Sequence, residues 1–390
     1  MTKVWLFLLG LLTQFVTCAD RHLDRARWSF APVPVARATD VRDAGMVADQ
    51  QIVVVDGKWE QWEPRTVVRF DADGKANSLR LPARDTAGCY GEALHTDGEA
   101  WRYSGCSGNG VQFAGSDRGP VYVPDDSTAH AHEWMPFDDA EGGVLLSVER
   151  DGRTCVAKLV TPAGIEKTLG TFYRGSDTWT TEPGESLLLD EEKIAMITLE
   201  PERDQWALVL RVFDQGEITT SRIAVASGSW SSIEAAAGAD GELVVVGVPY
   251  DTGGVVAFLI DPMQPDKPTV RHLSGATSTV ASHTVCVIAT GRGYAAAWID
   301  NRTVHLAEFD TRRVLPAVRV GDGAGGQHFP LLSLVHTPGD EPRDVAVLWT
   351  SDDGNVMMRR LPQPVTGALV AGELLARLSE RLDRLTGPPR

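Results

Sequence analysis

The stretch GRGYAAAWIDNRTVHLAEFD, residues 291–310, decides the fold of this chain. It contains two runs rich in apolar and aromatic residues, YAAAWID and VHLAEFD, separated by the short polar turn NRT. A similar run, SHTVCVIAT, precedes them, and another, LPAVRVGD, follows. Short apolar runs bounded by Gly, Asn and Asp turns indicate antiparallel hairpins. This part of the chain therefore predicts a sheet of four strands.

The same pattern of strand and turn recurs along most of the chain. Between Ala31 and Pro364 it can be laid over seven units of roughly 40 to 55 residues, the size of a four-stranded propeller blade. The pattern predicts an all-β fold, a single β-propeller of seven four-stranded blades, with six or eight left open because the hairpin assignments are loose. An apolar landmark recurs in the third strand of six units: Phe70, Phe113, Leu159, Phe213, Ile260 and Phe309.

The two ends of the propeller sequence complement each other. The last unit has three strands, and a spare run, WSFAPVPVA, lies at residues 28–36. An N-terminal strand that completes the last blade closes a propeller ring and removes its open edge. The sequence therefore predicts a propeller over residues 28–364 whose ring is closed by an N-terminal strand.

The unit in residues 293–310 has its closest echoes in DVAVLWTSDDGNVMMRRL and GVLLSVERDGRTCVAKLVTPAG. In these segments an aromatic-ended second strand, an acidic turn and a third strand recur. They resemble the divergent propeller repeats of exported bacterial proteins. The resemblance implies the propeller fold and carries no catalytic residues, and it points to no specific family.

The N-terminus reads as an export signal. A basic start at Lys3 precedes an apolar run from Val4 to Val16, which has the length of a signal's hydrophobic region and is short for a membrane span. Cleavage after Ala19 would give a signal peptide over residues 1–19. Alternatively, the signal ends before Cys18, which then carries a lipid. We therefore expect an exported protein that is periplasmic, secreted or on the cell surface.

Charge narrows the range of partners. The chain of 390 residues has a formal net charge of −16 at pH 7. Nucleic acid and anionic membrane surfaces would be repelled, so we expect neither, apart from a membrane contact through a lipid on Cys18. Protein and carbohydrate ligands stay open, and the sequence leaves the oligomeric state undecided. We expect no cofactor, because the glycine-rich GDGAGG from Gly321 leads into a predicted strand, where a dinucleotide site needs a helix.

Four cysteines remain beyond Cys18. The segment GCYGEALHTDGEAWRYSGC, residues 88–106, predicts a hairpin that turns at Asp97-Gly98. In that register Cys89 lies opposite Cys106 at a non-hydrogen-bonded pair, where side chains come closest. We therefore expect a cross-strand disulfide between them in an oxidising compartment. The other two cysteines lie in apolar runs and are expected to be buried thiols.

The end of the chain, residues 365–386, predicts the one clear helix. Its leucines follow a spacing of three and four residues and share one face: Leu375, Leu378, Leu382 and Leu385. Packing on the propeller and pairing with another chain both stay open for this face.

The starts of the blades supply the candidate binding site. The first strand of a propeller blade lines the central channel, and the loop before it faces the opening of the ring. Aromatic side chains gathered there would form a stacking surface for a sugar, a peptide side chain or a cation. The competing interpretation is that each one fills the wedge between neighbouring blades. The ligand-binding candidates are Tyr90, Trp134, Trp179, Trp230, His283 and His328, with Asp40, Glu133 and Asp177 near the same openings.

The sequence gives only weak indications of a metal site or a catalytic site. His130 and His132 point to one face if their segment is a strand, and with Glu133 they could contribute to a metal site. A structural zinc needs four ligands, and no second cluster with matching spacing exists, so no metal is expected. A Gly-x-Ser-x-Gly elbow and a His-Glu-x-x-His motif are absent. No catalytic residue is assigned.

Three hypotheses of function follow. The first is an exported, non-catalytic binding or scaffolding propeller that recognises its ligand at the channel mouth. The second is a carbohydrate-active hydrolase or lyase, which two facing carboxylates with raised pKa values would favour. The third is a subunit of a cell-envelope assembly that docks through its C-terminal helix.

Overall fold

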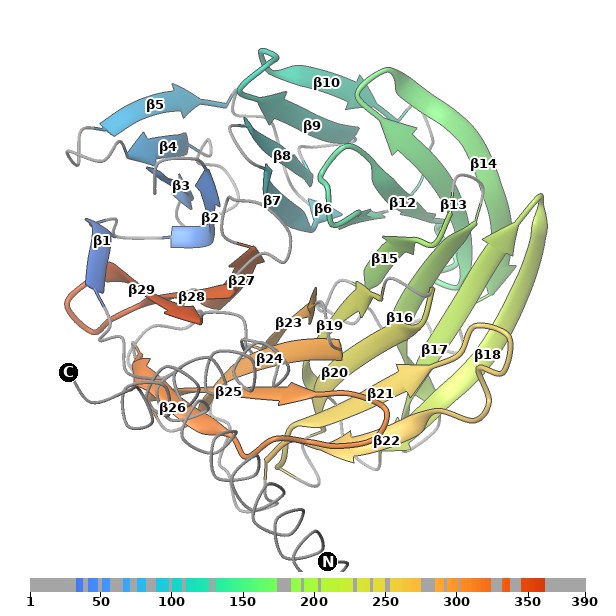
Figure 1. The fold of residues 1–390 in the computed structure, drawn as a ribbon. Coiled ribbons are helices and arrows are strands. Elements are labelled where there is room, and N and C mark those ends of the chain that lie inside the picture. The colour runs from blue at the N-terminus through green and yellow to red at the C-terminus, as the bar shows by residue number, and fades with distance from the viewer. Residues whose placement is uncertain are drawn as a thin grey trace, which may run out of the picture. The chain divides into compact units, whose positions relative to one another are not determined.

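The strands found in the chain group into seven antiparallel sheets, one of which gains a parallel fifth strand (Figure 1). This computed structural model describes residues 33–37, 41–47, 51–56, 66–70, 76–81, 89–97, 100–106, 110–125, 129, 131–173, 184–190, 193–202, 205–226, 230–238, 241–249, 253–274, 285–290, 293–300, 302–323, 332–336 and 345–361. All sheets belong to the unit Pro32–Arg359, apart from the last two residues of β29.

Six sheets are each built mainly from one continuous segment. Their strands, in chain order, are β2 (Val41–Val47), β3 (Gln51–Asp56), β4 (Thr66–Phe70) and β5 (Ala76–Arg80); β7 (Glu92–Asp97), β8 (Ala100–Cys106), β9 (Gly110–Gly115) and β10 (Val121–Pro124); β11 (Ala131–Pro136), β12 (Gly143–Val148), β13 (Thr154–Thr161) and β14 (Gly164–Tyr173); β15 (Glu185–Leu188), β16 (Ile194–Glu202), β17 (Gln205–Asp214) and β18 (Glu217–Ala226); β19 (Trp230–Ala237), β20 (Leu243–Pro249), β21 (Val256–Ile260) and β22 (Thr269–His272); β23 (Val285–Thr290), β24 (Gly293–Asp300), β25 (Thr303–Phe309) and β26 (Val318–Asp322).

The remaining sheet joins the two ends of the propeller sequence. Its order is β1 (Val33–Arg37), β29 (Asn355–Leu361), β28 (Val345–Thr350) and β27 (Leu332–His336). Strand β1 pairs antiparallel with β29, and the register shifts between Pro34 and Ala36. The N-terminal strand therefore completes the last sheet, as the sequence predicted.

The first strands of the sheets form a closed ring. Each of β2, β7, β11, β15, β19, β23 and β27 contacts the next one, and β27 contacts β2. Figure 1 shows the sheets following one another in chain order around a common centre. The all-β propeller prediction is confirmed. The predicted C-terminal helix and the predicted signal lie outside the described residues, in which no helix has the length and apolarity to cross a membrane.

Apolar side chains fill the seams between successive sheets. Five core clusters each draw on two consecutive sheets, from β4 with β8 and β9 through to β20 and β21 with β24 and β25. Four of the third-strand landmarks are buried in these seams: Phe113, Phe213, Ile260 and Phe309. Burial of large side chains contributes about 25 cal/mol per Å² of apolar surface, so the seams hold each sheet against the next.

Two tryptophan indoles make hydrogen bonds across the same seams. The Trp134 indole donates to Ser104 of the preceding sheet at 3.2 Å, and the Trp349 indole donates to the Asp322 carbonyl at 2.9 Å. Directional bonds of this kind fix the registry between sheets, which apolar packing alone does not fix.

One short strand departs from the predicted pattern. Strand β6 (Cys89–Tyr90) pairs in parallel with β11, on the side of β11 opposite to β12. The backbone bonds place Cys106 opposite Gly91, so the predicted register, with Cys89 opposite Cys106, is wrong by two residues. The β7–β8 hairpin ends at the pair Asp97 and Ala100, one residue later than the turn expected from Asp97-Gly98.

The cysteines divide as follows. Cys155 and Cys286 are buried thiols, as predicted. Cys106 takes part in a disulfide bond. The side chain of Cys89 lies outside the described residues, so its pairing with Cys106 stays a prediction.

Gly91 makes the passage from β6 to β7 sterically feasible. Its φ is +108°, and a Cβ added there would collide with the Trp134 carbonyl oxygen. Only glycine adopts that backbone conformation and tolerates such a close approach without strain.

We predict that Gly91→Ala lowers the free energy of unfolding by about 2–4 kcal/mol, from backbone strain and a steric clash. Gly119→Ala is the matched control, because nothing lies within 4 Å of the place that its Cβ would take. Chemical denaturation measures both, and an equal, small effect of the two changes would contradict this account of β6.

Candidate functional site

Two of the aromatic candidates, Trp134 and Trp230, are buried in the seams between sheets. Trp134 in β11 is fully buried, and its ring meets Phe113 edge-on with centroids 5.7 Å apart. Trp230 in β19 is 1% exposed and lies 5.8 Å from Phe258. Neither indole can stack on a ligand, so the prediction that these two form a binding surface is wrong. They fill the wedge between sheets instead.

The other predicted ligand-binding residues cannot be compared in the same way. The backbone of Tyr90 lies in β6, in register with Glu133 of β11, but its side chain is outside the described residues. The remaining candidates lie entirely outside the described residues: Trp179, His283, His328, Asp40 and Asp177. Their roles stay predictions.

The weak metal candidate His132 belongs to a buried polar hub instead. Its Nδ1 lies 3.3 Å from the Asp125 carboxylate, which also accepts a bond from Ser147 at 2.6 Å and pairs with Lys158 at 2.5 Å. Burial lowers the pKa of His132 below its usual value. No group of three His, Cys, Asp or Glu side chains suited to a metal occurs in the described part of the chain, and His130 lies outside it. This hub joins the β10–β11 connection to the next sheet.

Three carboxylates at consecutive positions of the ring form the strongest candidate site. Glu185 begins β15, Glu234 lies within β19, and Asp138 is the second residue after β11. These strands are neighbours, since β11 contacts β15 and β15 contacts β19. We call Asp138, Glu185 and Glu234 the inner carboxylates. Each side chain reaches solvent at least in part.

The charges of the other two inner carboxylates act on Glu185. Desolvation, then the charge of Glu234, then that of Asp138 raise the pKa of Glu185 well above its usual value. Desolvation and the neighbouring Asp139 raise the pKa of Asp138 to about 7. Asp138 is nevertheless an exposed residue. A carboxylate in that position loses hydration yet stays accessible to a ligand.

Within the described residues, no positive charge offsets the burial of Asp138 and Glu185. Every cause that shifts the pKa of either group acts upward, and none comes from Lys, Arg or His. Among the same residues Asp138 has no hydrogen bond or ion pair. Like charges held together at a desolvated position destabilise the folded state. Such destabilising arrangements are found mainly at functional sites.

The loop that carries Asp138, residues 137–142, is fixed at both ends. The Phe137 amide donates to the Gly142 carbonyl at 2.8 Å, and the Ala140 amide donates to the Phe137 carbonyl at 2.9 Å. Ala140 is buried with φ +53°, a conformation that non-glycine residues adopt at a cost. We call residues 137–142 the acidic loop.

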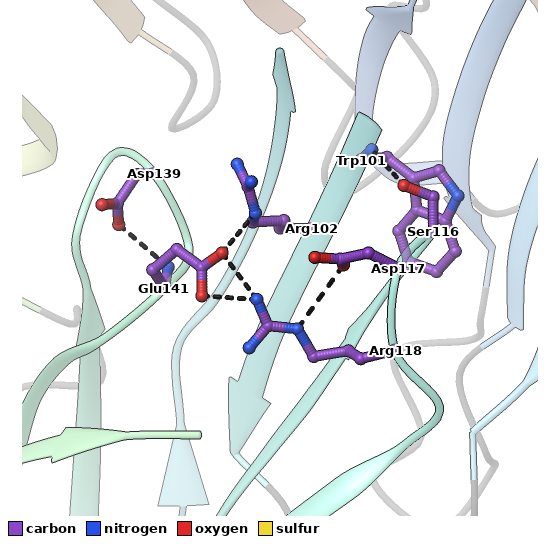
Figure 2. Close-up of polar contacts among 7 residues, drawn as sticks. All are labelled: Trp101, Arg102, Ser116, Asp117, Arg118, Asp139 and Glu141. Carbon is purple, nitrogen blue, oxygen red and sulfur yellow. Dashed lines mark hydrogen bonds and ion pairs between the residues drawn. The ribbon is translucent and has the colours of Figure 1, made fainter. Parts of the chain in front are cut away.

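An ion network ties the acidic loop to the preceding sheet. Figure 2 shows the Glu141 carboxylate between Arg102 of β8 and Arg118 of the β9–β10 turn. Arg118 Nη2 donates to both Glu141 oxygens at 2.6 Å. The Glu141 amide donates to Asp139 at 2.9 Å. We call Arg102, Arg118 and Glu141 the Glu141 clamp.

The inner carboxylates were missed from the sequence because acidic residues are numerous. Asp and Glu total 53, so no pair stands out by type. A usable signal was present nonetheless: Glu185 and Glu234 lie in segments expected to be innermost strands, ESLLLD and SIEAAAGADG. A charged residue in an otherwise apolar inner strand is the informative exception.

Comparison with known proteins agrees with the geometry at the level of fold. No protein-family model and no curated protein matches the chain. Virginiamycin B lyase from Staphylococcus aureus is 11% identical with a TM-score of 0.52, over 85% of this chain and 98% of that one. This chain has a β-propeller fold.

Two further solved structures lead to the same conclusion. A streptogramin B lyase is 10% identical with a TM-score of 0.52, over 86% of this chain and 99% of its own. Hydrazine synthase from Kuenenia stuttgartiensis is 11% identical with a TM-score of 0.50, over 85% and 97%. At such low identity the likeness shows the propeller fold alone.

We predict that Asp138→Asn stabilises the protein above pH 7 and has little effect at pH 4. The pKa of this group is raised on folding to about 7, so the folded state holds its proton more tightly than the unfolded state. Its stabilising contribution is therefore complete below pH 4 and is lost as pH rises through 7. Melting temperatures across pH 4–8.5 measure the difference. A variant less stable than the parent at pH 8 would contradict the account.

Proposed function

We propose that this protein is an exported binding propeller that recognises a cationic ligand through the inner carboxylates. The observation that carries the proposal is the placement of Asp138, Glu185 and Glu234 on three consecutive blades, with every resolved influence on Asp138 and Glu185 unfavourable to their charge. A ligand with ammonium or guanidinium groups would supply the missing positive charge and replace lost hydration with charge-assisted hydrogen bonds.

The bulk charge of the chain supports the same ligand class. A net charge of −16 draws cations toward the molecule and repels anions. Export is supported by the N-terminal sequence and fits a protein that meets its ligand outside the cytoplasm. The proposal also includes three features that the sequence pattern supports. These are the count of seven blades, a lipid on Cys18 and a C-terminal helix that docks on a partner.

Binding is expected to strengthen as pH rises, because raised pKa values leave part of the site protonated near neutrality. A cation binds the ionised carboxylates and releases their protons. Isothermal titration calorimetry with spermidine, in buffers of different ionisation enthalpy, would detect that proton release directly.

We predict that the Glu185→Gln/Glu234→Gln double variant binds spermidine at least ~10-fold more weakly, the loss expected from one or two charge-assisted contacts. Asp151→Asn is the control, because Asp151 is an exposed turn residue bonded to Thr154 and Arg153 in the same blade as Asp138. Binding that survives the double substitution would overturn the proposal, as would the absence of binding by spermidine, putrescine and arginine alike.

A second candidate is acid–base catalysis by a propeller lyase or hydrolase acting on a carbohydrate. It is favoured by Glu185, because burial and the charge of Glu234 raise the pKa of this carboxyl group above its usual value, as a general acid requires. A bell-shaped pH dependence of turnover on a panel of polysaccharides, abolished by Glu185→Gln, would favour this candidate over simple binding.

A further inference from the structure

The first strand β11 already carries an added strand on its inner edge. We call the inner edge of a first strand the edge that faces away from the second strand of its sheet. On β11 this edge pairs in parallel with β6, where Cys89 lies opposite His132 and Tyr90 lies opposite Glu133. An extended segment can therefore reach an inner edge of this ring and form backbone hydrogen bonds there.

The two first strands that follow β11 in the ring have no such partner. Strands β15 and β19 each stand at the end of the strand order of their sheets, so no strand pairs with their inner edges in the described part of the chain. Strand β15 lies beside β11, since the Ser186 hydroxyl donates to the Met135 carbonyl at 2.6 Å. An unpaired strand edge presents backbone N–H and C=O groups to which an extended peptide can pair.

A glutamate occupies the same level of all three strands. In each strand it lies three residues before the last residue that pairs with the second strand, so the three positions are equivalent. The pairs are Glu133 with Leu146, Glu185 with Ile197 and Glu234 with Val246, and the last pairs are Pro136 with Gly143, Leu188 with Ile194 and Ala237 with Leu243. The level at which β6 pairs with β11 is therefore the level of Glu185 on β15 and of Glu234 on β19.

The exposure of this glutamate differs between the covered strand and the two uncovered ones. Glu133, which pairs with Tyr90 of β6, is 1% exposed, whereas Glu185 and Glu234 are half-buried and reach solvent. No cation is among the groups that shift the pKa of Glu185. A strand added to the β15 edge would bring its side chains to these carboxylates, and cationic side chains would form charge-assisted hydrogen bonds with them.

We propose that the ligand of the inner carboxylates is an extended basic peptide that adds a strand to the inner edge of β15, as β6 does on β11. Its backbone pairs with the strand edge, and its lysine or arginine side chains pair with Glu185, Glu234 and Asp138. Alternate side chains of a strand lie on one face, so basic residues at every second position suit this site. The net charge of −16 attracts such a peptide. This inference rests on the proposed function, because it names the ligand class of the same site.

The test uses isothermal titration calorimetry of the full chain with the peptide acetyl-Lys-Val-Lys-Val-Lys-amide. Two derivatives carry backbone N-methyl groups, one on the lysines and the other on the valines. Alternate N–H groups of a strand point to the same edge, so one derivative loses the donors that face β15 and the other keeps them. The side-chain charge is the same in both.

We expect one methylated peptide to bind at least ~10-fold more weakly than the parent peptide, and the other to bind within about threefold of it, because only one set of backbone hydrogen bonds is lost. Equal affinities of the two methylated peptides would overturn the proposal, since attraction between charges alone does not distinguish them.

The equivalent glutamates supply a matched pair of variants. Glu185→Gln should weaken the parent peptide by ~10-fold, whereas Glu133→Gln, at the level that β6 covers, should leave the affinity within about threefold. An equal loss in both variants, or none in Glu185→Gln, would contradict the placement on β15. Amide hydrogen exchange of the unaltered protein covers a variant that does not fold. The peptide should slow exchange in residues 185–188, and unchanged exchange at saturation would overturn the proposal.

Spermidine separates failure of this inference from failure of the proposed function. It has the same number of positive charges as the peptide but no peptide backbone. If spermidine binds through Glu185 and Glu234 while the two methylated peptides bind alike, strand addition fails and the cation site stands. If the peptide, spermidine, putrescine and arginine all fail to bind, both the inference and the proposed function fail.

Discussion

The structure depends on apolar packing between the faces of successive sheets. Each seam draws its side chains from two neighbouring blades, so no blade can bury its faces alone. Tryptophans are the largest pieces of this packing, and four of them are less than 2% exposed. The packing is a constraint as well as a source of stability, because it commits the packed faces of these sheets to their neighbours.

That constraint decides where polar chemistry can be placed. Where a sheet face is packed in a seam, it offers no place for reactive or binding groups, which are left with the inner strands and the turns. The inner carboxylates occupy those positions, on β15, on β19 and two residues after β11. The polar groups that cross a seam, such as the Asp125 hub, are instead matched by partners and serve as connections. By contrast, no cation is among the groups that shift the pKa of Asp138 or Glu185.

Much of the fold could be predicted from sequence, because strand and turn chemistry is local. The stretch at residues 291–310 forms β24 and β25 as expected, with Tyr294 opposite Phe309. The closing strand was predicted from a missing fourth strand, and β1 pairs with β29. The hairpin register at Cys106 was wrong because the strands reverse one residue later than expected. Cys89 and Tyr90 then pair with β11 of the next blade, a non-local choice that hairpin counting does not see.

The candidate site was harder to predict for a related reason. Aromatic residues at blade starts suit a channel mouth and a seam equally well, and tertiary packing decided for the seam at Trp134 and Trp230. The inner carboxylates, which replace these aromatic residues as candidates, are recognised by their proximity in space. The charges of Glu234 and Asp138, from two other blades, raise the pKa of Glu185. Sequence spacing carries no trace of that proximity.

The central claim is that carboxylates of separate blades form one electrostatically coupled group. Titration of Glu185 by carboxyl NMR, in the parent and in Glu234→Gln, tests it most directly. The account predicts that the raised pKa of Glu185 falls toward its usual value in the variant, because one of the charges that opposes its ionisation is gone. A Glu185 that titrates identically in both proteins would contradict the claim and leave three unrelated acidic residues in place of a site.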